Sequence, residues 1–161
     1  MATEIERRFR LKNDSWRGIV EGEWLKQGYL SVEAERTVRV RVKGDQAWLT
    51  LKSLISDISR HEFEYPIPLA DAETILAAMC PMLVEKKRYR IQLNGHLWEV
   101  DEFFGQNAGL VLAEIELTSE AEAYVRPDWL GDEVTHDPRY TNAYLSEHPW
   151  PSWPQGVERS L

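Results

Sequence analysis

The sequence is poor in cysteine, since Cys80 is the only one among 161 residues. A single thiol cannot form an intramolecular disulfide or supply a zinc site built from several cysteines. The class of small disulfide-rich secreted proteins is therefore excluded. Because Cys80 follows Met79 at the end of an expected helix, we predict that it packs in the core.

Long apolar runs are missing as well. No stretch of about 18 apolar residues occurs, which predicts that no helix spans a membrane. Residues 1–6 contain no basic segment followed by an apolar one, which argues against a signal peptide. We therefore expect a cytoplasmic protein that does not bind membranes.

Cations are in the minority: 19 Lys and Arg stand against 27 Asp and Glu, and the formal net charge is −8. This balance argues against a nucleic-acid-binding protein. It leaves room for a small anionic ligand, because a total says nothing about where the cations lie. The length suits one domain with a substantial core.

Period-two alternation of apolar and polar residues runs through most of the chain and is typical of strands. Tight turns are indicated at Gly44-Asp45 and Asn94-Gly95. We predict an α+β fold in which eight antiparallel strands close into a barrel, or tunnel, with helices packed outside it. The expected strands lie near 3–11, 26–31, 36–43, 46–53, 59–66, 84–92, 96–103 and 111–118.

Helices are expected in four of the connections. Capping residues and prolines place them from Asn13 or Asp14 to about Glu23, over 72–79, from Ser119 to before Pro127, and over 142–147. We divide the chain into a domain at 1–147 and a tail at 148–161. The tail contains three prolines and two tryptophans, so it is expected either to be loose or to dock as a strap.

Charged residues of one sign repeat at every second position of several expected strands, where side chains point to the same face. One interpretation is a solvated sheet face with cross-strand ion pairs. The other is a closed ring whose charged faces converge on a central cavity, which explains better why like charges are neighbours. The same-sign pairs are Glu4/Glu6, Arg39/Arg41, Lys86/Arg88 and Glu114/Glu116.

A cavity with clustered cations and clustered carboxylates suits a polyanion accompanied by divalent cations. Carboxylates are hard oxygen ligands for Mg²⁺ or Mn²⁺, and arginine forks bind phosphate with two hydrogen bonds. The ligand is therefore expected to be a small molecule with linked phosphates.

The ordered motifs resemble those of the CYTH domain family, also called the triphosphate tunnel metalloenzymes, over roughly residues 2–147. Glu4-Ile5-Glu6-Arg7-Arg8 is similar to the E-x-E-x-K motif of that family, although arginine replaces its lysine. Arg8 can still bind phosphate, but it cannot exchange a proton near neutral pH. Further matches are Gln27-Gly28-Tyr29, Val38–Arg41, Leu49–Lys52, Arg60–Glu64, Val84–Tyr89, Trp98–Asp101, Ala113–Glu116 and Gly131–Thr135 with Asp137, Arg139, Tyr140 and Asn142.

The resemblance implies an eight-stranded tunnel and the metal-dependent hydrolysis of a triphosphate, with Mg²⁺ or Mn²⁺ as cofactor. The last motif is similar to small bacterial members that convert inorganic tripolyphosphate to pyrophosphate and phosphate. The alternatives are an adenylyl cyclase of the same fold, a thiamine or nucleoside triphosphatase, and a non-catalytic polyphosphate-binding module. The oligomeric state is left open, with a homodimer as one option.

Site residues follow from the charged faces and the resemblance together. The phosphates are expected to contact Arg8, Arg39, Arg41, Lys52, Arg60, Lys86 and Arg88. The metal ligands of first choice are Glu4, Glu6, Glu114 and Glu116, followed by Glu62, Glu64 and Asp101. Tyr29 and Lys52 resemble a tyrosine–lysine pair near the leaving group in the thiamine triphosphatase branch. The catalytic set is therefore Glu4, Glu6, Arg8, Tyr29 and Lys52.

Other polar and aromatic residues are given structural roles. Glu99 is held as an ion-pair partner, while Arg139 and Asn142 are expected to fix the C-terminal segment. Surface or capping positions are expected for His61 and His136, and core positions for Trp16 and Trp24.

Overall fold

A computed structural model describes residues 3–153 of the chain. Within this range, the antiparallel strands form one sheet. Eight of them are β1 (Thr3–Leu11), β2 (Gly22–Glu33), β3 (Arg36–Lys43), β4 (Gln46–Leu54), β5 (Ser59–Ile67), β6 (Leu83–Leu93), β7 (His96–Phe104) and β8 (Val111–Glu116). These are the eight strands that the alternation predicts, with shifts of at most two residues at their ends except that β2 begins four residues before its predicted start.

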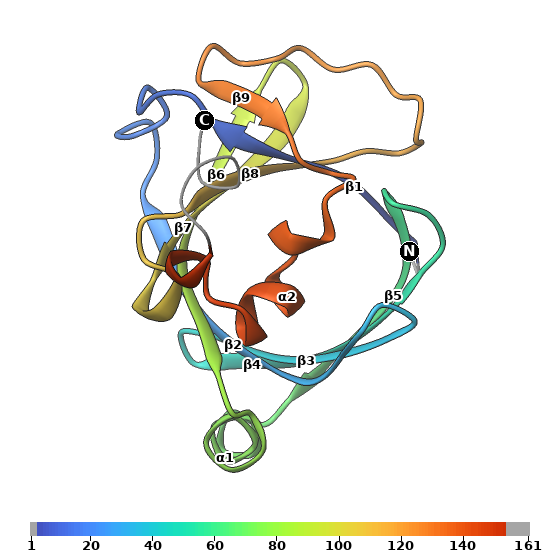
Figure 1. Ribbon diagram of the computed structural model, residues 1–161, viewed down its shortest axis with the longest axis vertical. Helices are drawn as coiled ribbons and strands as arrows, with labels where there is room; N and C mark the ends of the chain where they lie inside the picture. The colour runs from blue at the N-terminus through green and yellow to red at the C-terminus, as the bar shows by residue number, and fades with distance from the viewer. Residues whose placement is uncertain (1–2, 154–161) are drawn as a thin grey trace.

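The strands close into a ring, which Figure 1 shows from its open end. Their order is β5-β4-β3-β2-β6-β7-β8-β1, and β1 pairs with β5 to complete the circle. A ninth strand, β9 (Leu130–Glu133), pairs with β1 as well. β9 is too short to show an alternating pattern, so the sequence did not predict it.

The apolar residues that point outward form two clusters. One lies under α1 (Leu69–Met79), where Val40 packs against Ala72, Leu76 and Cys80. The other is covered by irregular segments and includes Phe9, Trp16, Trp98, Ile115 and Trp129. The α1 helix and the core position of Cys80 agree with the sequence-based predictions.

Two predicted helices are wrong. Residues 12–20 form turns before β2 begins at Gly22, and Gly18 has a φ of 81°, which ends helical geometry. Residues 118–127 contain no helix either: the Glu122 carboxylate accepts hydrogen bonds from the backbone and hydroxyl of Thr118 and contacts His96. The Glu122 side chain therefore bonds to Thr118 in place of Ser119, the predicted partner, and these contacts close a loop.

The position of the last helix also differs from the prediction. α2 (Asn142–Glu147) forms where it was expected, but it lies within the outline of the ring in Figure 1 and not outside it. Together with η2 (Pro138–Tyr140) and η3 (Trp150–Ser152), it contributes to a third apolar cluster on the inner side of β2, β6, β7 and β8. Helices therefore pack on both sides of the strands.

The beginning of the tail docks onto this third cluster. Trp153 contacts the rings of Tyr140 and Tyr144, and the backbone NH of Trp150 donates to Asn107. Of the two arrangements expected for the tail, docking is the one observed for 148–153; residues 154–161 lie outside the described range. No helix within the described residues combines the length and apolarity that membrane crossing requires.

Candidate active site

The inner faces of the ring strands surround a cavity of about 580 Å³. Every site residue predicted from the sequence lines this cavity except Asp101. Asp101 is 2% exposed, and its oxygens accept hydrogen bonds from Lys86 and Arg88 at 2.8 Å. Closure of the ring thus brings together side chains from strands that are distant in the sequence.

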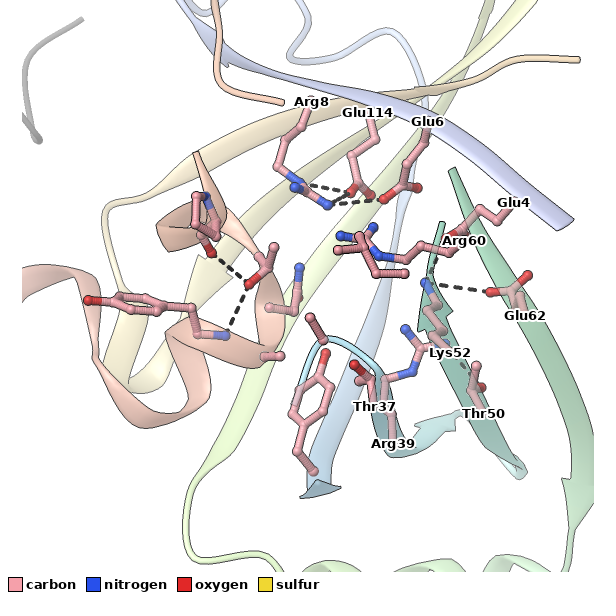
Figure 2. Close-up of a pocket in the computed structure, with 18 of the residues that line it drawn as sticks. Glu4, Glu6, Arg8, Thr37, Arg39, Thr50, Lys52, Arg60, Glu62 and Glu114 are labelled. Carbon is pink, nitrogen blue, oxygen red and sulfur yellow. Dashed lines mark hydrogen bonds and ion pairs between the residues drawn. The ribbon is translucent and has the colours of Figure 1, made fainter. Parts of the chain in front are cut away.

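Carboxylates gather on one wall of the cavity, where β1 lies between β5 and β8. Strand register places Glu6 opposite Glu116, and Arg8 opposite Glu114. Figure 2 shows Glu4, Glu6, Glu62 and Glu114 projecting from these strands toward the interior. We call Glu4, Glu6, Glu62, Glu114 and Glu116 the acidic wall.

The carboxyl groups of the acidic wall differ in their pKa values. Burial and the nearby carboxylates Glu114 and Glu4 raise the pKa of Glu6 to about 8. Burial would also raise the pKa of Glu114, but Arg8 and Arg88 outweigh it and hold that pKa well below its ordinary value. At neutral pH the Glu6–Glu114 pair therefore keeps one proton, on Glu6.

Four of the predicted cations are already paired with carboxylates. Lys52 Nζ lies 2.9 Å from Glu4 and 3.5 Å from Glu62. Arg88 contacts Asp101, Glu99 and Glu114, and Arg8 contacts Glu6 and Glu114. Lys86 pairs with Asp101 at 2.8 Å, but burial, with repulsion from Arg88 and Arg41, still lowers its pKa to about 7.

The remaining three arginines carry charge that carboxylates neutralise weakly or not at all. Within residues 3–153, neither Arg41 nor Arg60 has a carboxylate at ion-pair distance, and Arg41 donates to the side-chain oxygen of Gln27 instead. Burial and the cations Arg39 and Arg88 lower the pKa of Arg41 to about 9. Arg39 lies 3.5 Å from Glu64, and its buried Nε has no hydrogen-bond acceptor.

We call Arg39, Arg41 and Arg60 the free arginines. A guanidinium group that is shielded from water and lacks a close carboxylate is costly unless a ligand supplies the missing negative charge. An anion with several oxygens fits this requirement.

Glu99 and Asn142 take the structural positions expected of them, whereas Arg139 has a local ion pair. Glu99 pairs with Arg88 and Arg90, and Arg139 pairs with Asp137. The Asn142 side-chain oxygen accepts hydrogen bonds from Lys86 and Gln27, which fixes α2 to the ring. The expectation for Trp24 is wrong: it is 55% exposed and packs on Phe104 at the surface.

Tyr29 and Lys52 both line the cavity, but they do not hydrogen-bond to each other. Tyr29 instead accepts a hydrogen bond from Gln27 and packs into the apolar cluster near α2. His136 also faces the cavity, where it contacts Asp57 at 2.9 Å.

Sequence reasoning did not assign several polar cavity residues to the site, among them Thr50, Arg90 and Thr135. Thr50 is buried and binds both Arg39 and Glu64. It precedes Lys52 by two positions, and Arg90 follows Arg88 by two, so the same alternation could have identified both. Thr135 lies after β9 and carried no such signal.

The donor set on the acidic wall suits a divalent cation. In the described part of the chain, no three His, Cys, Asp or Glu side chains are already arranged as a metal-binding group. Glu4, Glu6 and Glu114 are turned toward Lys52 and Arg8 instead. Their oxygens are nevertheless the ligands that Mg²⁺ and Mn²⁺ prefer. The pKa of Glu6 is raised by burial and by the charge of Glu114 and Glu4, and a cation would neutralise that charge.

Comparisons with known proteins agree with this geometry. The sequence profile of the CYTH domain family matches residues 2–142. A protein of Acetivibrio thermocellus called inorganic triphosphatase is 45% identical over 151 residues, which cover 93% of this chain and 97% of that protein. A protein of Nitrosomonas europaea with the same name is 38% identical over 148 residues, covering 89% and 97%.

Solved structures show the same fold. A crystal structure described as an inorganic triphosphatase is 37% identical, covers 91% of this chain and 95% of its own, and superposes with a TM-score of 0.66. A structure described as a putative adenylate cyclase of Bacillus halodurans reaches a TM-score of 0.62 at 16% identity, over 74% of this chain and 84% of its own. The second likeness concerns the fold alone.

Proposed function

The chain belongs to the CYTH domain family, and we propose that it is a divalent-metal-dependent triphosphatase whose preferred substrate is inorganic tripolyphosphate. The ring of strands then serves as the tunnel in which the substrate is held. The observation that carries the proposal is that the acidic wall and the free arginines line one cavity. The names of the two curated relatives support the same reaction.

Hydrolysis of a triphosphate requires charge neutralisation and a correctly placed water molecule. The free arginines would bind the phosphate oxygens, because carboxylates neutralise their charge least. Water would attack a terminal phosphorus atom and break one P–O–P bond, releasing phosphate and pyrophosphate. Lys52 and Arg88 would be available as further phosphate contacts if substrate draws them from their carboxylates.

The metal would be held by Glu4, Glu6, Glu114 and Glu116, with Glu62 nearby. When bound, Mg²⁺ or Mn²⁺ would neutralise phosphate charge and lower the pKa of the attacking water. Asp101 is a weaker candidate because it is buried behind the cavity lining, and Glu64 is weaker because it lies outside the acidic wall, beside Arg39. The acidic wall also disfavours a non-catalytic anion-binding module, since carboxylates alone would repel phosphate.

A direct test measures phosphate release from tripolyphosphate, ATP and thiamine triphosphate, each with Mg²⁺, Mn²⁺ or EDTA. We expect metal-dependent hydrolysis that favours tripolyphosphate and falls at least about 100-fold in Glu4→Gln/Glu6→Gln, as expected for the loss of charged groups that contact the reacting centre. Glu73→Gln, on the exposed side of α1, is the matched control. Cyclic AMP and pyrophosphate from ATP would identify a cyclase instead, and binding without turnover would identify a binding module.

The location and assembly of the protein follow as secondary proposals. We place the enzyme in the cytoplasm, with a small polyanion as its ligand. A homodimer remains a prediction that light scattering of the purified protein would check.

A further inference from the structure

Arg8 is the cation most deeply embedded in the acidic wall. Its side chain enters the cavity from β1, and the residue is 6% exposed. The Nε and Nη2 atoms lie 3.0 and 2.9 Å from one oxygen of Glu114, and Nη2 lies 3.0 Å from one oxygen of Glu6. Figure 2 shows the guanidinium group joined to both carboxylates.

The backbone of Arg8 is fixed at the same time. Its NH donates to the Thr135 hydroxyl at 2.9 Å, and its carbonyl accepts from the backbone NH of Val134. Thr135 in turn contacts Glu133. The position of the side chain is therefore set by β1 on one side and the two carboxylates on the other.

These contacts differ from those of the free arginines. Arg41 and Arg60 have no carboxylate at ion-pair distance among the described residues, whereas Arg8 has two. A guanidinium group that bridges two carboxylates is already neutralised by charge-assisted hydrogen bonds. A phosphate would have to break both contacts to recruit it.

We propose that Arg8 is a positioning residue that serves as an internal counter-ion for Glu6 and Glu114 and competes with the divalent metal for their oxygens. This inference rests on the proposed function, because it assumes that these two carboxylates bind metal. In the metal-free protein Arg8 bridges the two carboxyl groups and balances the negative charge that the pair carries. It thereby weakens the metal affinity of the site, since a positive charge about 3 Å from both ligands disfavours a second cation there.

A role as a phosphate contact predicts different measurements. If Arg8 bound substrate, its removal would raise the KM for tripolyphosphate and leave metal binding without substrate unchanged. If it is a counter-ion, its removal strengthens metal binding even when no substrate is present. The two roles are therefore separated by a binding experiment that involves no catalysis.

The experiment is a calorimetric titration of the full chain with Mg²⁺ alone, with every variant in the same buffer. We expect Arg8→Gln to bind Mg²⁺ about tenfold more tightly than the wild type, because the competing charge is gone. Arg8→Lys keeps the charge but cannot reproduce the planar fork, so a smaller gain of about threefold is expected. Arg17→Gln removes one positive charge from the Glu102 ion pair on the outer surface and should leave the affinity unchanged.

Each result has a defined meaning. Unchanged or weaker Mg²⁺ binding by Arg8→Gln, with a raised KM, would overturn the inference and return Arg8 to the phosphate contacts. If Arg8→Gln does not fold, as judged by circular dichroism, Arg8→Lys is used in its place. Tighter Mg²⁺ binding by Arg8→Lys would then support the inference, and unchanged binding would overturn it. A wild type that binds no Mg²⁺ and hydrolyses tripolyphosphate in EDTA would refute both the proposed metal dependence and this inference.

Discussion

At the scale of single residues, the cations that line the cavity differ in whether a carboxylate already lies at ion-pair distance. Lys52, Lys86 and Arg88 pair with carboxylates, whereas Arg41 and Arg60 have no carboxylate partner within residues 3–153. This distinction affects stability as well as binding, because a charge without a partner contributes little to holding the fold together.

Arg60→Gln should therefore reduce substrate binding without weakening the protein. A charged hydrogen bond is worth about 1.5–3 kcal/mol, so the KM for tripolyphosphate should rise roughly tenfold or more while the melting temperature stays within a degree or two. Steady-state kinetics and thermal melts measure the two quantities. Arg36→Gln, in an exposed pair with Glu33, is the control and should change neither. A large drop in stability with normal kinetics would show that Arg60 is structural.

Glu6 makes the stability of the metal-free protein depend on pH. Its pKa is about 8 in the folded protein and 4.5 in its ordinary state, so between these values the folded chain holds a proton that the unfolded chain has lost. The free energy of unfolding contributed by Glu6 must then fall as the pH rises from 4.5 to 8.

Glu6→Gln removes that dependence. In EDTA, the variant and the wild type should have similar stability near pH 4.5, and at pH 8 the variant should be more stable by over about 1 kcal/mol, given about 1.4 kcal/mol per pKa unit. Urea unfolding at the two pH values measures the difference. A constant offset at both values would mean that Glu6 does not titrate in this range.

At the scale of elements, α1 is held against the ring by very close packing. A Cβ added at Gly28 on β2 would lie 2.7 Å from the Cβ of Cys80 and 2.9 Å from a methyl carbon of Leu76. Only glycine lets the end of α1 approach this strand so closely.

Gly28→Ala should push α1 away and destabilise the protein by about 1–3 kcal/mol, the usual cost of overpacking a core. Chemical denaturation measures the loss. Gly44→Ala is a useful contrast: its added Cβ meets nothing within 4 Å, but its φ of 60° still adds backbone strain. No measurable loss in Gly28→Ala would mean that α1 can shift away from β2 without cost.

At the scale of the whole molecule, the chain after β8 closes one side of the structure. It adds β9 to β1 and then brings α2 and residues 148–153 onto the inner apolar cluster. The C-terminal part of the chain is thus integral to the core, although its composition resembles a loose tail.

Trp153→Ala tests this integration. The side chain is 7% exposed and contacts two tyrosine rings, so its removal should lower the free energy of unfolding by about 3–5 kcal/mol. Ending the chain after Glu147 should cost at least as much, because Trp150 is lost too. Exposed Trp24 provides the control, and Trp24→Ala should cost far less. Equal melting temperatures for the wild type and the shortened chain would show that residues 148–161 do not stabilise the protein.

The sequence predicted the eight strands because alternation reports which face of a strand is buried, and this depends only on local backbone geometry. The same rule placed Glu4, Glu6 and Arg8 on one face, and all three line the cavity. The helices predicted at Asn13–Glu23 and Ser119 failed because capping residues also close loops, and only packing distinguishes the two outcomes.

What the sequence determined by itself is therefore the set of inward-facing charges and the family of the chain. Only the tertiary structure decided which charges pair: ring closure places Glu4 beside Lys52, and the register of β1 against β8 places Arg8 beside Glu114. It also decided that α2 lies inside the ring. These outcomes depend on contacts between segments far apart in the chain, for which no single stretch of sequence carries the information.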